Sequence, residues 1–248
     1  MTGFLRKKID AWANQMIITA VVFDLFGTLV DDFGASAGPG HTEKLAATLA
    51  APHDQLVSLW RQTTEMRVVG AFDSVEASIK YVCDAMNVNP GPEQIANAVE
   101  VRMDYVRRAL RPKADAVSTL TQLKARGYKL GLLSNSSIEI PLLWHETPFA
   151  NLMDTAIFSS RVRMKKPDCR IYNLACEGLG VTPGSCLYIA DGEDYELAAA
   201  AQVGLNSILI RNVSQKTQRR LHQEANEWQG QGIDTLSDVL EILKPSAE

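Results

Sequence analysis

The sequence predicts an α/β fold: a Rossmann-like parallel sheet core with helices on both faces, plus an inserted all-helical cap domain. After residue 111, short apolar runs alternate with helical stretches, which is typical of βαβ units around a parallel sheet. Residues 41–110 carry only helix-period patterns and follow the first expected strand. We therefore expect a core of residues 1–33 and 111–248 and a helical cap of residues 34–110.

The individual elements follow from the same patterns. An apolar, β-branched run over residues 17–23 predicts a strand that is buried on both faces. Four cap helices are expected over residues 42–51, 54–69, 74–86 and 92–110, with Asp54 and Ser74 as helix N-caps. Further strands are expected over residues 128–133, 155–158, 186–189 and 207–210, and further helices over 114–126, 171–179 and 196–203.

Composition narrows the class of protein. The chain has 248 residues, 46% of them hydrophobic, which is enough to bury a large core. Lys and Arg total 25 against 29 Asp and Glu, so the net charge of −4 gives no basic footprint for nucleic acid. No apolar run approaches the ~20 residues of a membrane span. The four cysteines form no CxxC pair, and such sparse usage fits a reducing compartment. We expect a cytoplasmic protein with no nucleic-acid or membrane partner.

Polar residues follow several of the expected strands. Asp24, Ser134, Asn135 and Asp191 come at strand ends, and Lys166 lies in the loop after the third strand. A single Asp after a strand is commonly a turn residue. However, ligands of open parallel sheets bind at the carboxyl ends of the strands, so several polar residues at one edge indicate a functional site.

Four short motifs in this order resemble those of the haloacid dehalogenase-like hydrolase superfamily. They are VFDLFGTL at residues 22–29, LLSN at 132–135, KPD at 166–168 and IADG at 189–192, with Glu196 beyond. The resemblance covers roughly residues 17–210 and includes a helical cap inserted after the first motif.

The resemblance implies a role for each matching residue. Asp24 would be the covalent nucleophile, with Thr28 donating to the nucleophile or the transferred group. Ser134 and Asn135 would donate to a phosphate or carboxylate oxygen of the substrate. Lys166 would stabilise negative charge, with Lys165 as the rival candidate.

The resemblance also implies a magnesium site. Asp24, Asp191 and the backbone carbonyl of Phe26 would supply the oxygen ligands that this hard cation prefers. Glu196 would either bind the metal through water or orient Lys166. Glu193 and Asp194 are open to a plainer interpretation, as acidic residues that favour a helix N-terminus.

The chain departs from the superfamily at Phe26. Phosphatases of the superfamily carry an Asp there as general acid and base, and Phe cannot transfer a proton. Phe26 would instead line the substrate site, as aromatic residues do in the 2-haloacid dehalogenases. No clear match exists for the carboxylate-binding Arg of those dehalogenases; Arg61 is the substitute we expect, with Arg67 as a further candidate, and both also suit solvated helix positions.

These observations leave three hypotheses. The first is a magnesium-dependent phosphatase that acts on a small, anionic phosphorylated metabolite. The second is a metal-independent 2-haloacid dehalogenase, favoured by Phe26. The third is a catalytically weakened binding or regulatory protein, suggested by the missing acid–base Asp and by Ala190 in place of the usual Gly.

Overall fold

The computed structural model describes residues 18–33, 40–211 and 223–243 of the chain. Its centre is a six-stranded, fully parallel sheet with the strand order β3-β2-β1-β4-β5-β6. The strands are β1 Ala20–Phe23, β2 Lys129–Ser134, β3 Thr155–Phe158, β4 Cys186–Ala190, β5 Asn206–Ile210 and β6 Gln231–Ile233. Strands β2 and β3 are added on one side of β1 and strands β4 to β6 on the other, so the order of the strands reverses beside β1. Open parallel sheets bind ligands at such a point.

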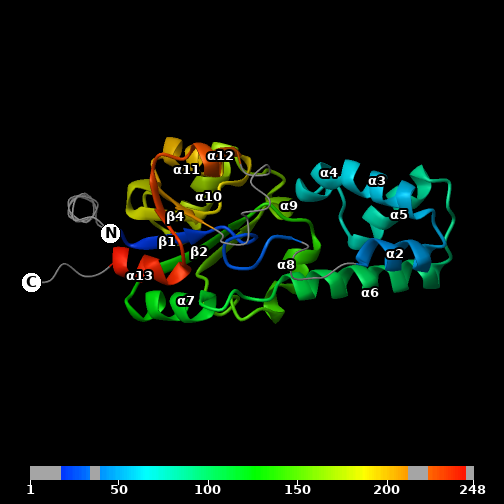
Figure 1. Ribbon diagram of the computed structural model, residues 1–248, viewed down its shortest axis with the longest axis horizontal. Helices are drawn as coiled ribbons and strands as arrows, with labels where there is room; N and C mark the ends of the chain where they lie inside the picture. The colour runs from blue at the N-terminus through cyan, green and yellow to red at the C-terminus, as the bar shows by residue number, and fades with distance from the viewer. Residues whose placement is uncertain (1–17, 34–39, 212–222, 244–248) are drawn as a thin grey trace, which may run out of the picture.

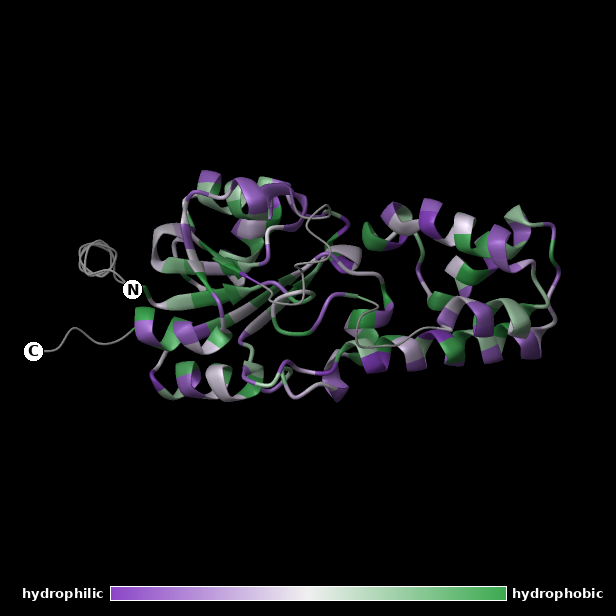
Figure 2. Cartoon of the chain, viewed as in Figure 1, coloured by the Kyte–Doolittle hydropathy of each residue, from purple (hydrophilic) through white to green (hydrophobic). Residues whose placement is uncertain are grey.

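Helices cover both faces of the sheet (Figure 1). One face carries α7 Ala116–Ala125 and α13 Val239–Ile242, and the other carries α10 Cys169–Leu179 and α11 Glu196–Val203. Short helical segments complete the core: α8 Glu139–Leu143, η1 Trp144–Glu146, α9 Ser159–Val162, η2 Pro183–Ser185, η3 Glu193–Tyr195, α12 Gln223–Glu227 and η5 Leu236–Asp238. The strands are almost continuously apolar (Figure 2), as expected for strands covered on both faces. These findings confirm the Rossmann-like α/β core.

The cap is a separate helical unit beside the sheet (Figure 1). It consists of α2 His41–Leu49, α3 His53–Gln62, α4 Thr64–Val68, α5 Val75–Ala85 and α6 Pro92–Ala109 around its own hydrophobic cluster. Ser74 caps α5 as expected, because its hydroxyl accepts a hydrogen bond from the Ala77 N–H at 3.0 Å. The prediction of Asp54 as an N-cap is wrong, because α3 begins at His53 with Pro52 at the N-cap position, so Asp54 lies within the first turn. The cap touches the core through α4 on α9 and α6 on α8. Glu65 of α4 also pairs with Lys165 at 2.8 Å.

Some boundaries differ from those expected. The helix expected over residues 54–69 is two helices that meet at Thr63, whose hydroxyl bonds back to the carbonyls of Leu59 and Trp60. The short edge strand β6 was not expected. The division at residues 33/34 and 110/111 remains a prediction; the last turns of α6, from Tyr105 on, pack into the large hydrophobic cluster of the core. Residues 1–17 of the expected core lie outside the described residues.

No helix in the described ranges is both long enough and apolar enough to cross a membrane. A cytoplasmic location remains a prediction.

Candidate active site

The carboxyl ends of β1, β2 and β4 meet at one edge of the sheet and bring the motif residues together. Asp24 directly follows β1, Ser134 is the last residue of β2, and Asp191 directly follows β4. The Asp24 N–H donates to the Ile189 carbonyl at 2.9 Å, which extends the sheet pairing by one residue. All three side chains are buried, so the nucleophile candidate faces an enclosed polar site.

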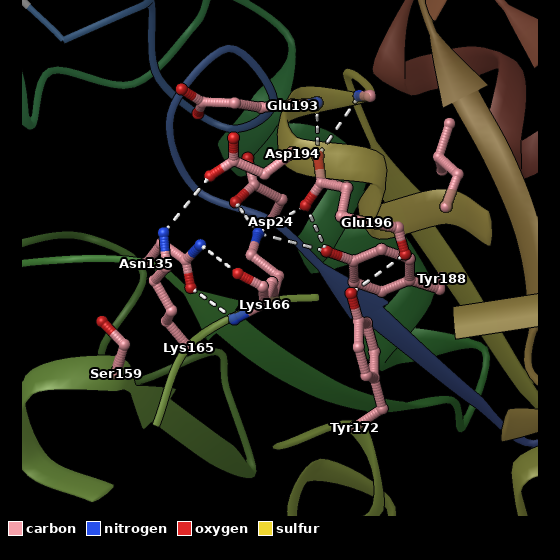
Figure 3. Close-up of polar contacts among 12 residues, drawn as sticks. Asp24, Asn135, Ser159, Lys165, Lys166, Tyr172, Tyr188, Glu193, Asp194 and Glu196 are labelled. Atoms are coloured by element: carbon pink, nitrogen blue, oxygen red, sulfur yellow. Dashed lines mark hydrogen bonds and ion pairs between the residues drawn. The ribbon is translucent and has the colours of Figure 1, made fainter. Parts of the chain in front are cut away.

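Lys166 is the cation at the centre of this site (Figure 3). Its Nζ donates to Asp24 Oδ1 at 2.6 Å, to Glu196 Oε2 at 2.5 Å and to the Tyr188 hydroxyl at 3.2 Å. The neighbouring Lys165 instead pairs with Glu65 of the cap and lies 3.8 Å from Asp194. Lys166 is therefore the lysine that contacts the nucleophile candidate.

Glu196 is fully engaged by neighbouring donors. Its Oε2 accepts from Lys166 and, at 2.6 Å, from the Tyr188 hydroxyl. Its Oε1 accepts from the N–H groups of Gly192 and Glu193, both at 3.2 Å. These contacts favour the orienting role for Glu196 over a role as a metal ligand.

The loop that carries Lys166 is held from the second motif. The Asn135 side chain accepts from the Lys166 N–H at 2.8 Å and donates to the Lys166 carbonyl at 3.1 Å. Asn135 thus positions Lys166, a role that its motif alone did not reveal. By contrast, the buried hydroxyls of Ser134 and Thr28 have no hydrogen-bond partner among the described residues. Both hydroxyls remain able to donate to a substrate oxygen.

Burial and crowding change the charges of the site. Burial raises the pKa of Asp191 well above its usual range, and the carboxylates of Glu196 and Asp24 raise it further. Burial also raises the pKa of Glu196 to about 7 despite the opposing charge of Lys166. Burial alone would lower the pKa of Lys166, but the charges of Asp24 and Glu196 outweigh it and hold that pKa above its usual value. The site therefore contains more acidic groups than its lysine can neutralise.

This donor set fits a hard divalent cation. Carboxylate oxygens of Asp24, Asp191 and Glu196 lie within 4.8 Å of one another. Both oxygens of Glu196 accept hydrogen bonds, whereas the hydrogen bond from Lys166 engages only Oδ1 of Asp24. Asp24 and Asp191 are therefore the carboxylates that could hold a metal, and the Phe26 carbonyl remains a predicted ligand. A Cβ on Gly27 would lie 1.9 Å from Asp191 Oδ2, so only glycine at this position lets that carboxylate approach the loop.

Phe26 and Arg61, the two other predicted substrate-binding residues, lie outside the group of residues that contact Lys166. The Phe26 ring packs edge-to-face on Phe33, with the ring centroids 4.9 Å apart, and partly faces the core cluster. The Arg61 side chain is exposed on α3. No hydrogen bond or ion pair joins Arg61 to the acidic cluster in the part of the chain that the structure describes, so the structure does not bring it to the site.

Several residues of the site were not predicted from the sequence. Tyr188 was interpreted only as part of a buried strand, and its hydroxyl contacts could not be predicted from the strand pattern. Lys113 follows α6 where the chain returns to the core, and its ammonium donates to the Gly27 carbonyl. The pair Arg102–Glu139, with Nε and Oε1 2.6 Å apart, is buried where α6 meets α8. No local pattern marks these residues, because their partners are distant in the sequence.

Comparison with known proteins identifies the family of this chain. A family model described as haloacid dehalogenase-like hydrolase matches residues 18–204. An (S)-2-haloacid dehalogenase from Pseudomonas sp. (strain CBS-3) is 24% identical over 91% of this chain and 96% of its own length. A glyceraldehyde 3-phosphate phosphatase from Methanothermobacter thermautotrophicus is 30% identical over 54% of this chain and 59% of its own length.

Solved structures show the same fold. A 2-haloacid dehalogenase from Pseudomonas syringae pv. Tomato superposes with a TM-score of 0.65 at 19% identity, covering 91% of this chain and 98% of that one. A phosphatase from Thermococcus onnurineus gives a TM-score of 0.61 at 21% identity over the same shares. Dehalogenases and phosphatases thus both share this architecture.

Proposed function

Because the chain belongs to the haloacid dehalogenase-like hydrolases, we propose that it is a magnesium-dependent phosphatase of a small phosphorylated metabolite. The observation that carries this proposal is the cluster of three buried carboxylates, Asp24, Asp191 and Glu196, around one lysine. These three acidic groups outnumber the Lys166 and Lys113 ammoniums beside them, and a divalent cation would neutralise the remaining negative charge.

In the proposed reaction Asp24 is the nucleophile. Its carboxylate oxygen forms a bond to phosphorus while the bond from phosphorus to the leaving oxygen breaks, and the leaving group departs with that electron pair. Water then attacks the aspartyl phosphate, which releases inorganic phosphate and restores the carboxylate. When bound, Mg²⁺ would neutralise charge on the Asp24 carboxylate and the phosphoryl oxygens.

The surrounding residues stabilise the phosphoryl group during the reaction. Lys166, held by Glu196 and Asn135, balances the negative charge that collects on the phosphoryl oxygens. The Ser134 and Thr28 hydroxyls donate to those oxygens. Phe26 supplies no proton to the leaving group, so we expect the highest rates with leaving groups that depart as stable anions.

Two buried arginines of the cap support the proposal of an anionic substrate. Arg67 and Arg102 are both buried near the core, and Arg102 is paired with Glu139. In the described chain, Arg67 bonds only to neutral oxygens of residues 60–64. Burial and the charge of Arg102 lower the pKa of Arg67 to about 10, so Arg67 stays charged at neutral pH. This surplus of positive charge supports an anionic substrate, and it favours Arg67 over Arg61 as the cap residue that attracts it.

The test is phosphate release from a panel of small monoesters, with Mg²⁺ and with excess chelator. We expect turnover that requires Mg²⁺ and disappears in Asp24→Asn, since a neutral amide is a poor nucleophile. Asp191→Asn should lose both Mg²⁺ binding, measured by calorimetry, and most turnover. Full activity of the wild type in excess chelator would contradict the metal requirement.

Carbon–halogen hydrolysis is the second candidate function, and Phe26 is the observation that favours it. In this reaction halide leaves without a proton, and Asp24 would form an ester with the substrate carbon. The test is halide release from 2-chloropropionate without metal; no release at any pH would remove this candidate. Absence of turnover with both substrate classes would favour the binding or regulatory alternative.

Phe26→Asp separates the two chemistries. In a phosphatase the new carboxylate can donate and accept the missing proton, so turnover should rise ~10-fold or more. In a dehalogenase the same change should lower activity, because added negative charge beside Asp24 repels an anionic halo acid. Phosphate and halide release are measured side by side, with Mg²⁺ affinity as the check on an intact site.

A further inference from the structure

Lys113 lies at the point where the chain leaves the cap and returns to the active site. Its backbone N–H donates to the Leu29 carbonyl at 2.9 Å, and the preceding Pro112 pairs with Val30. These contacts fix the lysine beside the loop that begins at Asp24. Its ammonium then donates to the Gly27 carbonyl in that loop.

The acidic groups of the site lie against the same glycine. A Cβ on Gly27 would lie 1.9 Å from Asp191 Oδ2 and 2.9 Å from Asp32 Oδ1. The Lys113 ammonium and the Asp191 carboxylate therefore both adjoin one residue. Burial lowers the pKa of Lys113, and the negative charges of Asp191, Asp31, Asp32 and Asp24 partly oppose that lowering.

We propose that Lys113 is a built-in counter-cation of the acidic cluster. Its positive charge stabilises the carboxylates when no metal is bound, and the same charge repels Mg²⁺ and weakens its binding. This inference rests on the metal site of the proposed function. Lys166 cannot take the same part, because Asp24 and Glu196 already share it. Lys113 would thus set how much Mg²⁺ the site requires.

The first experiment is calorimetric titration of Mg²⁺ into the wild type, Lys113→Met and Lys113→Arg. Removing one positive charge near a divalent cation should tighten Mg²⁺ binding ~10-fold in the Met variant. The Arg variant keeps the charge and should bind like the wild type. Lys129→Met is the matched control, because Lys129 also donates to a backbone carbonyl, that of Leu179 at 2.7 Å, on another part of the sheet. Equal affinity in the Met variant and the wild type would overturn the proposal.

The second experiment needs no metal. In excess chelator we compare the melting temperatures of the wild type, Lys113→Met, Asp191→Asn and the double variant. Lys113→Met should lower the melting temperature by about 2–4 °C, and this loss should shrink when Asp191 is also neutral. Additive effects of the two substitutions would overturn the proposal. If the wild type bound no Mg²⁺, the proposed function would fail, while this cycle would still decide the role of Lys113.

Discussion

At the scale of single residues, the chemistry of the site depends on how Glu196 holds Lys166. Both oxygens of Glu196 accept hydrogen bonds, and the side chain is buried, so the loss of a partner would leave a buried polar atom unsatisfied. In Glu196→Gln one oxygen becomes an amide N–H₂, which cannot accept from Lys166 or from the backbone. We expect turnover to fall ~10²-fold, because Lys166 loses its anchor and half of its counter-charge.

The same variant separates a positioning role from a metal-binding role. Since Asp24 and Asp191 are the proposed ligands, Glu196→Gln should change Mg²⁺ affinity far less than Asp191→Asn does. Calorimetry on both variants measures this difference. A loss of Mg²⁺ binding in Glu196→Gln as large as in Asp191→Asn would show that Glu196 is itself a ligand.

The sequence predicts the residues of the site better than their contacts. Asp24, Ser134 and Asp191 could be found because each directly ends a strand, and strand ends converge in a parallel sheet. Which of Lys165 and Lys166 contacts Asp24 depends on the direction in which each side chain points. The hydrogen bonds between the Asn135 side chain and the Lys166 backbone join residues that are 31 positions apart in the sequence. Such contacts arise only when the chain is folded.

At the scale of elements, Gly70 sets how closely the cap approaches the core. This residue follows α4 with a φ of +72°, and a Cβ there would lie 2.1 Å from the Ser160 carbonyl oxygen of α9. Ser159 reinforces the contact by donating to the Val68 carbonyl at 2.7 Å. Gly70→Ala should therefore push α4 away from α9 and reduce both stability and turnover.

The loss of stability that the clash at Gly70 causes can be separated from the loss that backbone strain causes. Gly127 also has a positive φ, of +86°, but a Cβ there would meet nothing within 4 Å. Gly127→Ala should cost about 1 kcal/mol of unfolding free energy from strain alone, and Gly70→Ala a further 1–3 kcal/mol or so from the clash. Denaturant unfolding of both variants measures the difference. Equal losses of unfolding free energy in the two variants would mean that α4 and α9 can move apart at no cost in stability.

The elements themselves follow closely from hydrophobic periodicity, with instructive exceptions. The strand expected over residues 155–158 is found as β3, and the helix over 196–203 as α11. The break at Thr63 was not predicted, because a threonine hydroxyl that bonds back to its own helix leaves the apolar spacing unchanged. The edge strand β6, with only three residues, carries too little pattern to be recognised.

At the scale of the whole molecule, one buried ion pair joins the cap to the core. Arg102 of α6 and Glu139 of α8 are 3% and 1% exposed, so each depends on the other for its counter-charge. Burial would raise the pKa of Glu139, but the charge of Arg102 together with the hydrogen bonds from Ser137, Arg102 and the backbone holds that pKa below its usual value. The guanidinium also lies 5.3 Å from the ring centroid of Phe33 and of Trp60.

Arg102→Met should cost about 3–5 kcal/mol of unfolding free energy at neutral pH, because it leaves a buried carboxylate without a cation. Without Arg102 the folded-state pKa of Glu139 rises above its unfolded value, so the variant loses stability as pH rises through the unfolded value and regains it at lower pH. The deficit should therefore be smaller at pH 5 than at pH 7.5, and Glu139→Gln in the same chain should remove that dependence. Arg107 lies on α6 like Arg102 but forms an exposed ion pair with Glu146 of η1, so Arg107→Met should cost less than about 1 kcal/mol. Denaturant unfolding at the two pH values tests this; a deficit independent of pH would mean that the Glu139 charge does not destabilise the variant.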